Sequence, residues 1–346
     1  GVANTNIVWH AGKLMALEEG HMPTELDPLT LETRGYVEAY RGNVTAHPKI
    51  DPSGEMPWFA YSAGETPLNA TVAYGVTGAT GEVLRRDNFE APYSSMVHDF
   101  MVTRRHVLFP ILPLTGSLER AMRGAPPYAW EPEKGAYVGV MARDAGVETL
   151  RWFQTEACYV FHPMNAWEEG GRIFADVMEY PRAPLFPDPD GSRGQDASAR
   201  LVRWTFDLDG ESDVIGRAPL DDMAGEFPRF DERRTGLAYR HGWFAANTER
   251  PGEIHFDAIA HLDLKSGKRT LYELPAGDAV GEPIFVPASP TAAEGEGWLL
   301  AVAYRGSEDL SDLLVFDALD IAAGPLASAR APQRVPFGFH GNWRGA

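Results

Sequence analysis

Four of the ten histidines stand in short segments whose composition suggests chemistry rather than packing. Each is flanked by aromatic, proline, glycine or acidic residues: His47 in TAHPK, His98 in MVHDF, His162 in FHPMN and His340 in GFHGN. Imidazole is a good ligand for divalent first-row metals, iron included. We therefore treat these four as candidate metal ligands. The others are read as ordinary surface or core residues: His10, His21, His106, His241, His255 and His261.

The separations between the four candidates are 51, 64 and 178 residues. Such distances exclude a local zinc finger or a helical pair of histidines, so spacing alone defines no metal site. A β-propeller could still bring them together, because the innermost strand of each blade passes the central axis. One inward residue from each of several blades could then reach one ion.

The elements that would position these histidines are mainly short strands. Runs rich in Val, Ile, Tyr, Phe and Trp recur between Gly, Pro, Asn and Asp, with 35 Gly and 27 Pro in all. Examples are residues 58–61, 71–76, 107–112, 136–142, 201–208, 298–304 and 313–317. Only residues 116–122 and 308–312 suggest short helices. We predict a single all-β propeller domain over residues 1–346.

Composition excludes several classes of function. The 31 basic and 49 acidic residues give a net charge of −18, which disfavours nucleic acid as a partner. No apolar run approaches the ~20 residues needed to cross a bilayer, so no integral membrane segment is predicted. Cys158 is the only cysteine, which excludes an internal disulfide and favours a cytoplasmic location. The chain lacks both a signal peptide and an initiator Met, so we expect its amino-terminal part to be missing.

The four histidine segments resemble, in order, the four ligand motifs of the carotenoid cleavage oxygenase family. The resemblance spans almost the whole chain, and further segments agree with it. These are residues 4–6 (NTN), 16–20 (ALEEG), 51–55 (DPSGE), 141–144 (MARD), 225–229 (GEFPR) and 281–287 (GEPIFVP).

The resemblance implies a seven-bladed β-propeller with iron on its axis and a loop or helix cap over one face. It also implies a non-haem Fe(II) enzyme with O₂ as co-substrate. In this family three glutamates support the metal-binding histidines. By resemblance, Glu19 would serve His98, Glu226 would serve His162 and Glu282 would serve His340. His47 would have no carboxylate partner.

Residues 4–17 look most like the branch of the family that cleaves stilbenes, the lignostilbene dioxygenases. The resemblance then implies cleavage of the central C=C bond of a hydroxystilbene by O₂ to give two aromatic aldehydes. The substrate would be a small apolar phenol of resveratrol or lignostilbene type. Lys13 is the candidate for binding the phenol, and strand alternation would place it on the same face as Glu19.

Two alternatives remain open. One is an apocarotenoid-cleaving oxygenase of the same family, which needs no phenol. The other is a metal-free propeller that binds a ligand in its central pocket. The sequence makes no prediction of oligomeric state.

Overall fold

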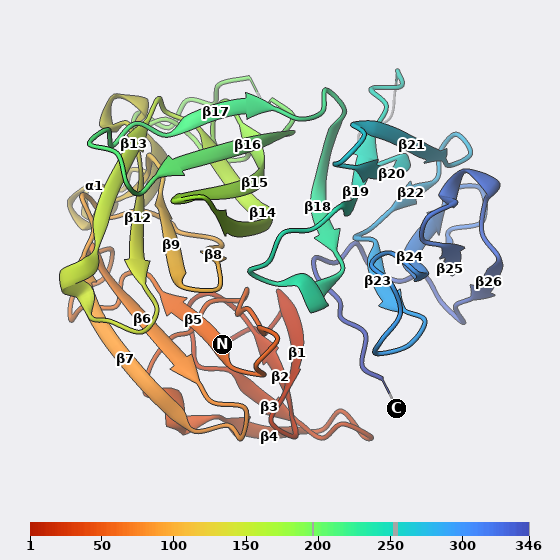
Figure 1. The fold of residues 1–346 in the computed structure, drawn as a ribbon, viewed down its shortest axis with the longest axis horizontal. Coiled ribbons are helices and arrows are strands. Elements are labelled where there is room, and N and C mark those ends of the chain that lie inside the picture. The colour runs from red at the N-terminus through yellow and green to blue at the C-terminus, as the bar shows by residue number, and fades with distance from the viewer. Residues whose placement is uncertain (196, 252–254, 346) are drawn as a thin grey trace.

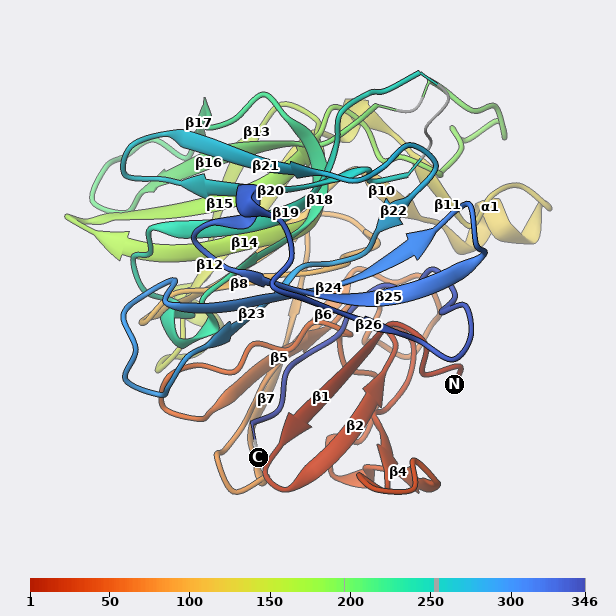
Figure 2. The ribbon, with the colours of Figure 1, turned by 90° about the vertical axis from the view of Figure 1, so that its right-hand side faces the viewer.

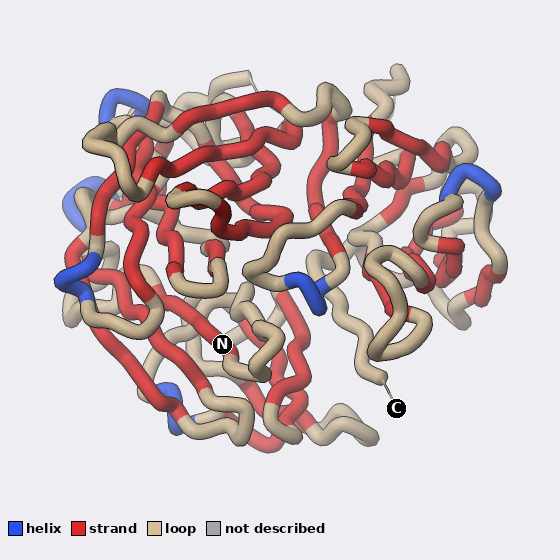
Figure 3. The backbone as a smooth tube through the Cα atoms, viewed as in Figure 1, coloured by secondary structure: helices blue, strands red, loops and turns tan. Residues whose placement is uncertain are grey.

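The computed structural model describes residues 1–195, 197–251 and 255–345. Residues 196, 252–254 and 346 of the predicted domain lie outside the described residues. Antiparallel sheets surround a central axis, and helices are few and short (Figures 1 and 3). The prediction of an all-β propeller is correct in class.

The described chain forms six propeller sheets in sequence order. The first three contain β1 (Asn6–His10), β2 (Lys13–Leu17), β3 (Thr24–Leu26) and β4 (Thr33–Tyr36); β5 (Met56–Ala60), β6 (Thr71–Thr77) and β7 (Val83–Glu90); and β8 (Met101–Val102), β9 (His106–Ile111), β12 (Ala136–Ala142) and β13 (Arg151–Thr155).

The other three sheets follow around the axis. They contain β14 (Tyr159–Glu169), β15 (Arg172–Tyr180), β16 (Arg200–Asp207) and β17 (Gly216–Pro219); β18 (Ala224–Phe230), β19 (His241–Asn247), β20 (Ala258–Asp263) and β21 (Lys268–Glu273); and β22 (Ala279–Val280), β23 (Ile284–Pro287), β24 (Gly297–Arg305), β25 (Leu310–Asp317) and β26 (Ala327–Arg330).

The prediction of seven blades is therefore wrong: the described residues form six. The six sheets together occupy residues 6–330, and a blade needs about 40–50 residues. The described segments outside that range are too short for another one. The number seven was taken from the family resemblance. The strand-like runs in the sequence could not supply a number, because they do not show which strands share a sheet.

A smaller group of elements lies at one end of the axis. The pair β10 (Leu114–Gly116) and β11 (Tyr128–Trp130) is accompanied by α1 (Leu118–Met122), as Figure 2 shows. The Ser117 side chain accepts from Arg120 N–H and caps α1, as predicted for residues 116–122. The described residues also contain five 3₁₀ turns: η1 (Glu38–Tyr40), η2 (Pro132–Lys134), η3 (Val147–Thr149), η4 (Glu232–Arg234) and η5 (Ile321–Ala323).

The second predicted helix, residues 308–312, is wrong. Leu310 already begins β25, and the turn before it has Asp309 at φ 52°, in the left-handed region. An aspartate tolerates that conformation in a tight turn better than most residues. Polar residues in a hairpin turn therefore resembled the start of a helix.

Apolar side chains fill the spaces between adjacent sheets. One cluster joins the third, fourth and fifth sheets and includes Phe153, Trp204 and Phe244, all fully buried. Strands that are covered on both faces read as continuous apolar runs, as in β6 and β9. Among the described helices, none has the length and apolar character needed to span a membrane.

Candidate metal centre

The four candidate histidines come from one strand and three irregular segments. His162 lies on β14, where the register with β15 shifts between Val160 and Pro163. His47 lies in the loop that follows η1, and His98 lies just before β8. His340 lies on the irregular segment after β26. Only His162 is on a strand within the described chain, so most ligands reach the axis from segments beside the strands rather than from the strands themselves.

The structure brings all four imidazoles together. One ring nitrogen from each lies within 4.8 Å of the others. The Nε2 atoms of His47 and His98 are 3.1 Å apart, as are those of His98 and His162. The Nε2 atom of His340 is buried and has no hydrogen-bond partner among the described residues. Four nitrogen lone pairs directed at one point fit a shared cation, and this donor set suits iron.

Burial keeps two of these rings in the form that binds metals. Removal from water, followed by the effect of neighbouring imidazoles, holds the pKa of His47 and His162 well below the usual range. Both are therefore neutral near pH 7, with a free lone pair. Burial also acts on His98, but the adjacent Glu19 carboxylate outweighs it and raises the pKa.

Each of the three glutamates lies beside the histidine that resemblance assigned to it. Glu226 Oε2 is 2.6 Å from His162 Nδ1, and Glu282 Oε1 is 3.0 Å from His340 Nδ1. Glu19 Oε1 contacts His98 Nδ1. In each pair the carboxylate faces Nδ1, so Nε2 is the atom directed at the shared point.

The two most buried glutamates have different electrostatic environments. Burial raises the pKa of Glu226 to about 8. Glu282 is also buried, but the Arg229 guanidinium and His340 outweigh that effect and lower its pKa to about 2. Arg229 Nη1 is 2.9 Å from Glu282 Oε2. The charge of Glu282, which supports His340, is therefore compensated by Arg229. The charge of Glu226, which supports His162, is not.

A β-bulge in β18 makes this arrangement possible. Glu226 and Arg229 are three residues apart, so a regular strand would direct them to opposite faces. The pairing with β19 shifts between these two residues, and Phe227 has φ 56°. The bulge turns both side chains toward the site. The Phe227 ring also lies against His162 and His340, with both centroid distances 5.4 Å.

Sequence reasoning missed a carboxylate close to His47. Asp99 Oδ2 is 3.9 Å from His47 Nδ1, and the two oxygens of this buried carboxylate accept from Lys49 Nζ at 2.7 and 2.9 Å. His47 thus has a carboxylate nearby, although beyond hydrogen-bonding distance. The signal was present in the HDF and HPK motifs, but nothing in the sequence pairs residues 50 positions apart.

Lys13 is not brought to the site. Its Nζ pairs with Glu25 on the neighbouring strand, and its side chain is 43% exposed. Strand β2 ends at Leu17, and Glu19 lies in the bend that follows. Alternation along β2 therefore does not extend to Glu19, and the predicted shared face of Lys13 and Glu19 is wrong. The phenol-binding role of Lys13 stays a prediction.

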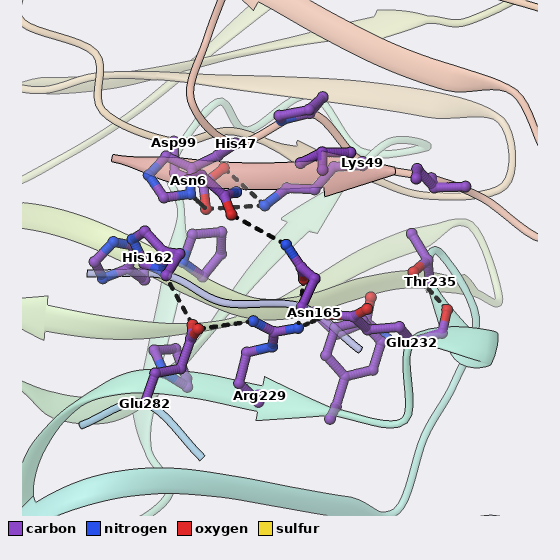
Figure 4. Close-up of a pocket in the computed structure, with 18 of the residues that line it drawn as sticks. Asn6, His47, Lys49, Asp99, His162, Asn165, Arg229, Glu232, Thr235 and Glu282 are labelled. Carbon is purple, nitrogen blue, oxygen red and sulfur yellow. Dashed lines mark hydrogen bonds and ion pairs between the residues drawn. The ribbon is translucent and has the colours of Figure 1, made fainter. Parts of the chain in front are cut away.

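A cavity of about 610 Å³ adjoins the cluster (Figure 4). His47, His162 and His340 contribute to its wall. Its polar lining includes Asn6, Lys49, Asp99, Asn165, Arg229, Glu232 and Asn342, and its apolar lining includes Trp9, Phe100, Met164 and Phe230. The histidines can therefore be reached from a space large enough for water and small molecules.

Four histidines that converge in a β-propeller fit a shared metal ion, and known proteins show which family the chain belongs to. The sequence model of the family described as "Retinal pigment epithelial membrane protein" (RPE65) matches residues 1–345. The isoeugenol monooxygenase of Pseudomonas putida is 41% identical, over 99% of this chain and 75% of that protein. The lignostilbene-α,β-dioxygenase isozyme III of Sphingomonas paucimobilis is 35% identical, over 100% of this chain and 75% of that protein.

Structural comparison agrees. The crystal structure of Pseudomonas brassicacearum lignostilbene dioxygenase superposes with a TM-score of 0.95 and 34% identity, covering 100% of this chain and 76% of that one. The chain belongs to the RPE65 family, the carotenoid cleavage oxygenases. The predicted family is confirmed, as is the prediction that the chain is an enzyme of the alkene-cleaving oxygenase class.

Proposed function

We propose that this protein is a non-haem Fe(II) dioxygenase that cleaves the C=C bond conjugated to a phenol ring. One oxygen atom of O₂ would go to each alkene carbon, giving two carbonyl products, one of them an aromatic aldehyde. The observation that carries the proposal is the cluster of four imidazoles on the axis of a fold shared with stilbene- and isoeugenol-type oxygenases. We also propose that residues 1–346 form a single domain and that the protein is cytoplasmic.

In this proposal His47, His98, His162 and His340 hold the iron, and Glu19, Glu226 and Glu282 orient three of them. When bound, iron would supply the chemistry that activates O₂ toward an alkene. Four neutral ligands would leave the ion its full charge, because none of the four cancels it. The buried, carboxylate-supported rings are held in place before any metal arrives, which lowers the reorganisation needed for binding.

The substrate class is narrowed by the degree of similarity. Identity to the Pseudomonas isoeugenol monooxygenases is 40–41%, against 35% for the lignostilbene dioxygenase. This difference favours a phenol with a short alkenyl side chain over the hydroxystilbene predicted from sequence. Both belong to one chemical class, a 4-hydroxyphenyl alkene. The apocarotenoid alternative requires no phenol.

Oxygen uptake by iron-loaded protein separates these possibilities. We expect iron at one per chain, and O₂ consumption equal to the alkene consumed, with isoeugenol and more slowly with resveratrol. The methyl ether of isoeugenol is the matched control and should react poorly. If the protein turns over an apocarotenal but none of the phenols, its substrate class is apocarotenoids rather than phenols. Protein that holds no iron and consumes no O₂ would indicate the metal-free binding propeller.

A further inference from the structure

The fourth histidine lies on the least supported part of the site. Within the described residues, the segment from 331 to 345 contains neither helix nor strand. Phe337, Phe339 and Trp343 on this segment are each more than half exposed. The His340 side chain is nevertheless only 5% exposed and faces the rings of His47 and His162. Besides the Phe227 ring and the Thr5 carbonyl, which accepts from the His340 N–H at 3.3 Å, polar contacts of the next two residues hold it in place.

Arg229 supplies polar support to this segment. Its Nη1 donates to the carbonyl oxygen of Gly341 at 3.0 Å, and its Nη2 donates to Asn342 Oδ1 at 3.0 Å. The same guanidinium pairs with Glu282 and contacts Glu232, and Figure 4 shows it between these two carboxylates. One buried side chain thus joins β18 to the two residues that follow His340.

Glu282 completes the support. Its Oε1 faces His340 Nδ1, and its Oε2 accepts from the Gly341 N–H at 3.0 Å. Gly341 is therefore held at its N–H by Glu282 and at its carbonyl by Arg229. With both backbone groups fixed and the ring tethered at Nδ1, the direction of His340 Nε2 is determined.

We propose that Arg229 is a positioning residue that fixes the segment carrying His340, so that this histidine is directed at the metal position before metal binds. Only an arginine can do this, because a planar fork binds several acceptors at once. Lysine keeps the charge but offers a single nitrogen. Of the two measurements that test this inference, hydrogen exchange and Co(II) binding, only the second depends on the proposed metal centre.

The test is hydrogen exchange of the metal-free protein, followed by mass spectrometry of peptides. In Arg229→Lys we expect exchange in residues 337–345 to accelerate roughly tenfold, while peptides from β14 and β19 stay unchanged. The matched control is Arg240→Lys. Arg240 makes a two-pronged pair with Asp263 at 2.9 and 2.7 Å on an exposed surface, away from the site. It should not change exchange in residues 337–345.

The second measurement is binding of Co(II), a spectroscopic stand-in for iron. Arg229→Lys should bind Co(II) roughly tenfold more weakly than wild type, and Arg240→Lys should not. If wild-type protein binds no Co(II), the metal centre fails while the exchange result still decides the role of Arg229.

A second variant protects the test against misfolding. Asn342→Ala removes the contact with Arg229 Nη2 and leaves the Arg229–Glu282 pair in place, but it also removes the Nδ2 contacts with Asn6 and Ile7. Asn342→Asp is its control, because it keeps an oxygen for Arg229 and loses only the Nδ2 contacts, and Asn342→Ala should loosen the segment more than this control does. If Arg229→Lys accelerates exchange throughout the protein, Asn342→Ala decides, and it should loosen only residues 337–345. Unchanged exchange of that segment in both variants, or in the variant that folds, overturns the proposal.

Discussion

Replacing Glu226 and Glu282 by glutamine should weaken metal binding by unequal amounts. The reason is how many acceptor atoms each carboxylate uses. Glu226 uses Oε2 for both His162 Nδ1 and Phe227 N–H, and its Oε1 has no hydrogen-bond partner among the described residues. Glu282 uses both oxygens, Oε1 for His340 and Oε2 for the Gly341 N–H and Arg229.

A glutamine has one acceptor oxygen. In Glu226→Gln, measured above pH 8 where the Glu226 carboxyl is ionised, that oxygen can take the place of Oε2, so only the charge is lost. Charge-assisted hydrogen bonds are about twice as strong as neutral ones, so the loss is about 1–1.5 kcal/mol, or roughly tenfold in metal affinity. In Glu282→Gln the –NH₂ must face either His340 or the Gly341 N–H and Arg229. Leaving a buried donor without an acceptor costs a further ~1–3 kcal/mol, so we expect a loss of about 100-fold or more.

Competition between each variant and a chelator, with Co(II) absorption as the signal, measures both affinities. Glu168→Gln is the matched control. Glu168 Oε1 lies 2.8 Å from His106 Nδ1, a carboxylate–histidine pair of the same kind that is not part of the cluster. Its metal affinity should equal that of wild type. Equal losses in Glu226→Gln and Glu282→Gln, or the reverse order, would refute the reasoning from acceptor count.

Two further predictions follow from the surroundings of single residues. Lys13→Met should leave kcat/KM on isoeugenol within about twofold, because the Lys13 ammonium pairs with Glu25 and does not line the cavity. Steady-state assays decide, and a tenfold fall would instead support the phenol-binding role predicted from sequence. Burial, assisted by His241, lowers the pKa of His261 to about 4. As the pH falls below about 6.5, His261 therefore becomes protonated in the unfolded chain but stays neutral in the folded chain. The free energy of unfolding should therefore fall as pH drops from about 6.5 toward 4, by up to about 3 kcal/mol from this residue. Urea unfolding of wild type and His261→Gln at pH 7 and pH 5 measures it, and an identical pH dependence in the two proteins would contradict it.

The sequence predicted the identity of the site better than its construction. The four histidines and three glutamates were found through motifs, and the structure places each glutamate beside its assigned histidine. Their convergence could not be calculated from spacings of 51, 64 and 178 residues, since it depends on how the sheets pack around the axis. The number of blades was wrong for the same reason. Strand alternation identifies strands, not their grouping.

The role of Arg229 was beyond sequence reasoning in a different way. The GEFPR motif drew attention to the segment, but its partners Gly341 and Asn342 lie 112 and 113 residues away. The direction of the Arg229 side chain also depends on the bulge at Phe227, which reverses the ordinary alternation. A bulge involves a single residue, and no periodic pattern reveals it.

The contact between Asn342 and Asn6 has a consequence for the synthesis of the protein. Asn342 Nδ2 donates to Asn6 Oδ1 at 3.0 Å and to the Ile7 carbonyl, so the His340 segment is held partly by the first strand. Ribosomes add about 5–20 residues per second, so the 178 residues from His162 to His340 take roughly 10–35 s. An ion that meets the growing chain in that interval finds at most three of the four imidazoles. Three histidines suit zinc, so if the proposed site holds iron, the timing of metal supply relative to chain completion would affect which metal the finished protein carries.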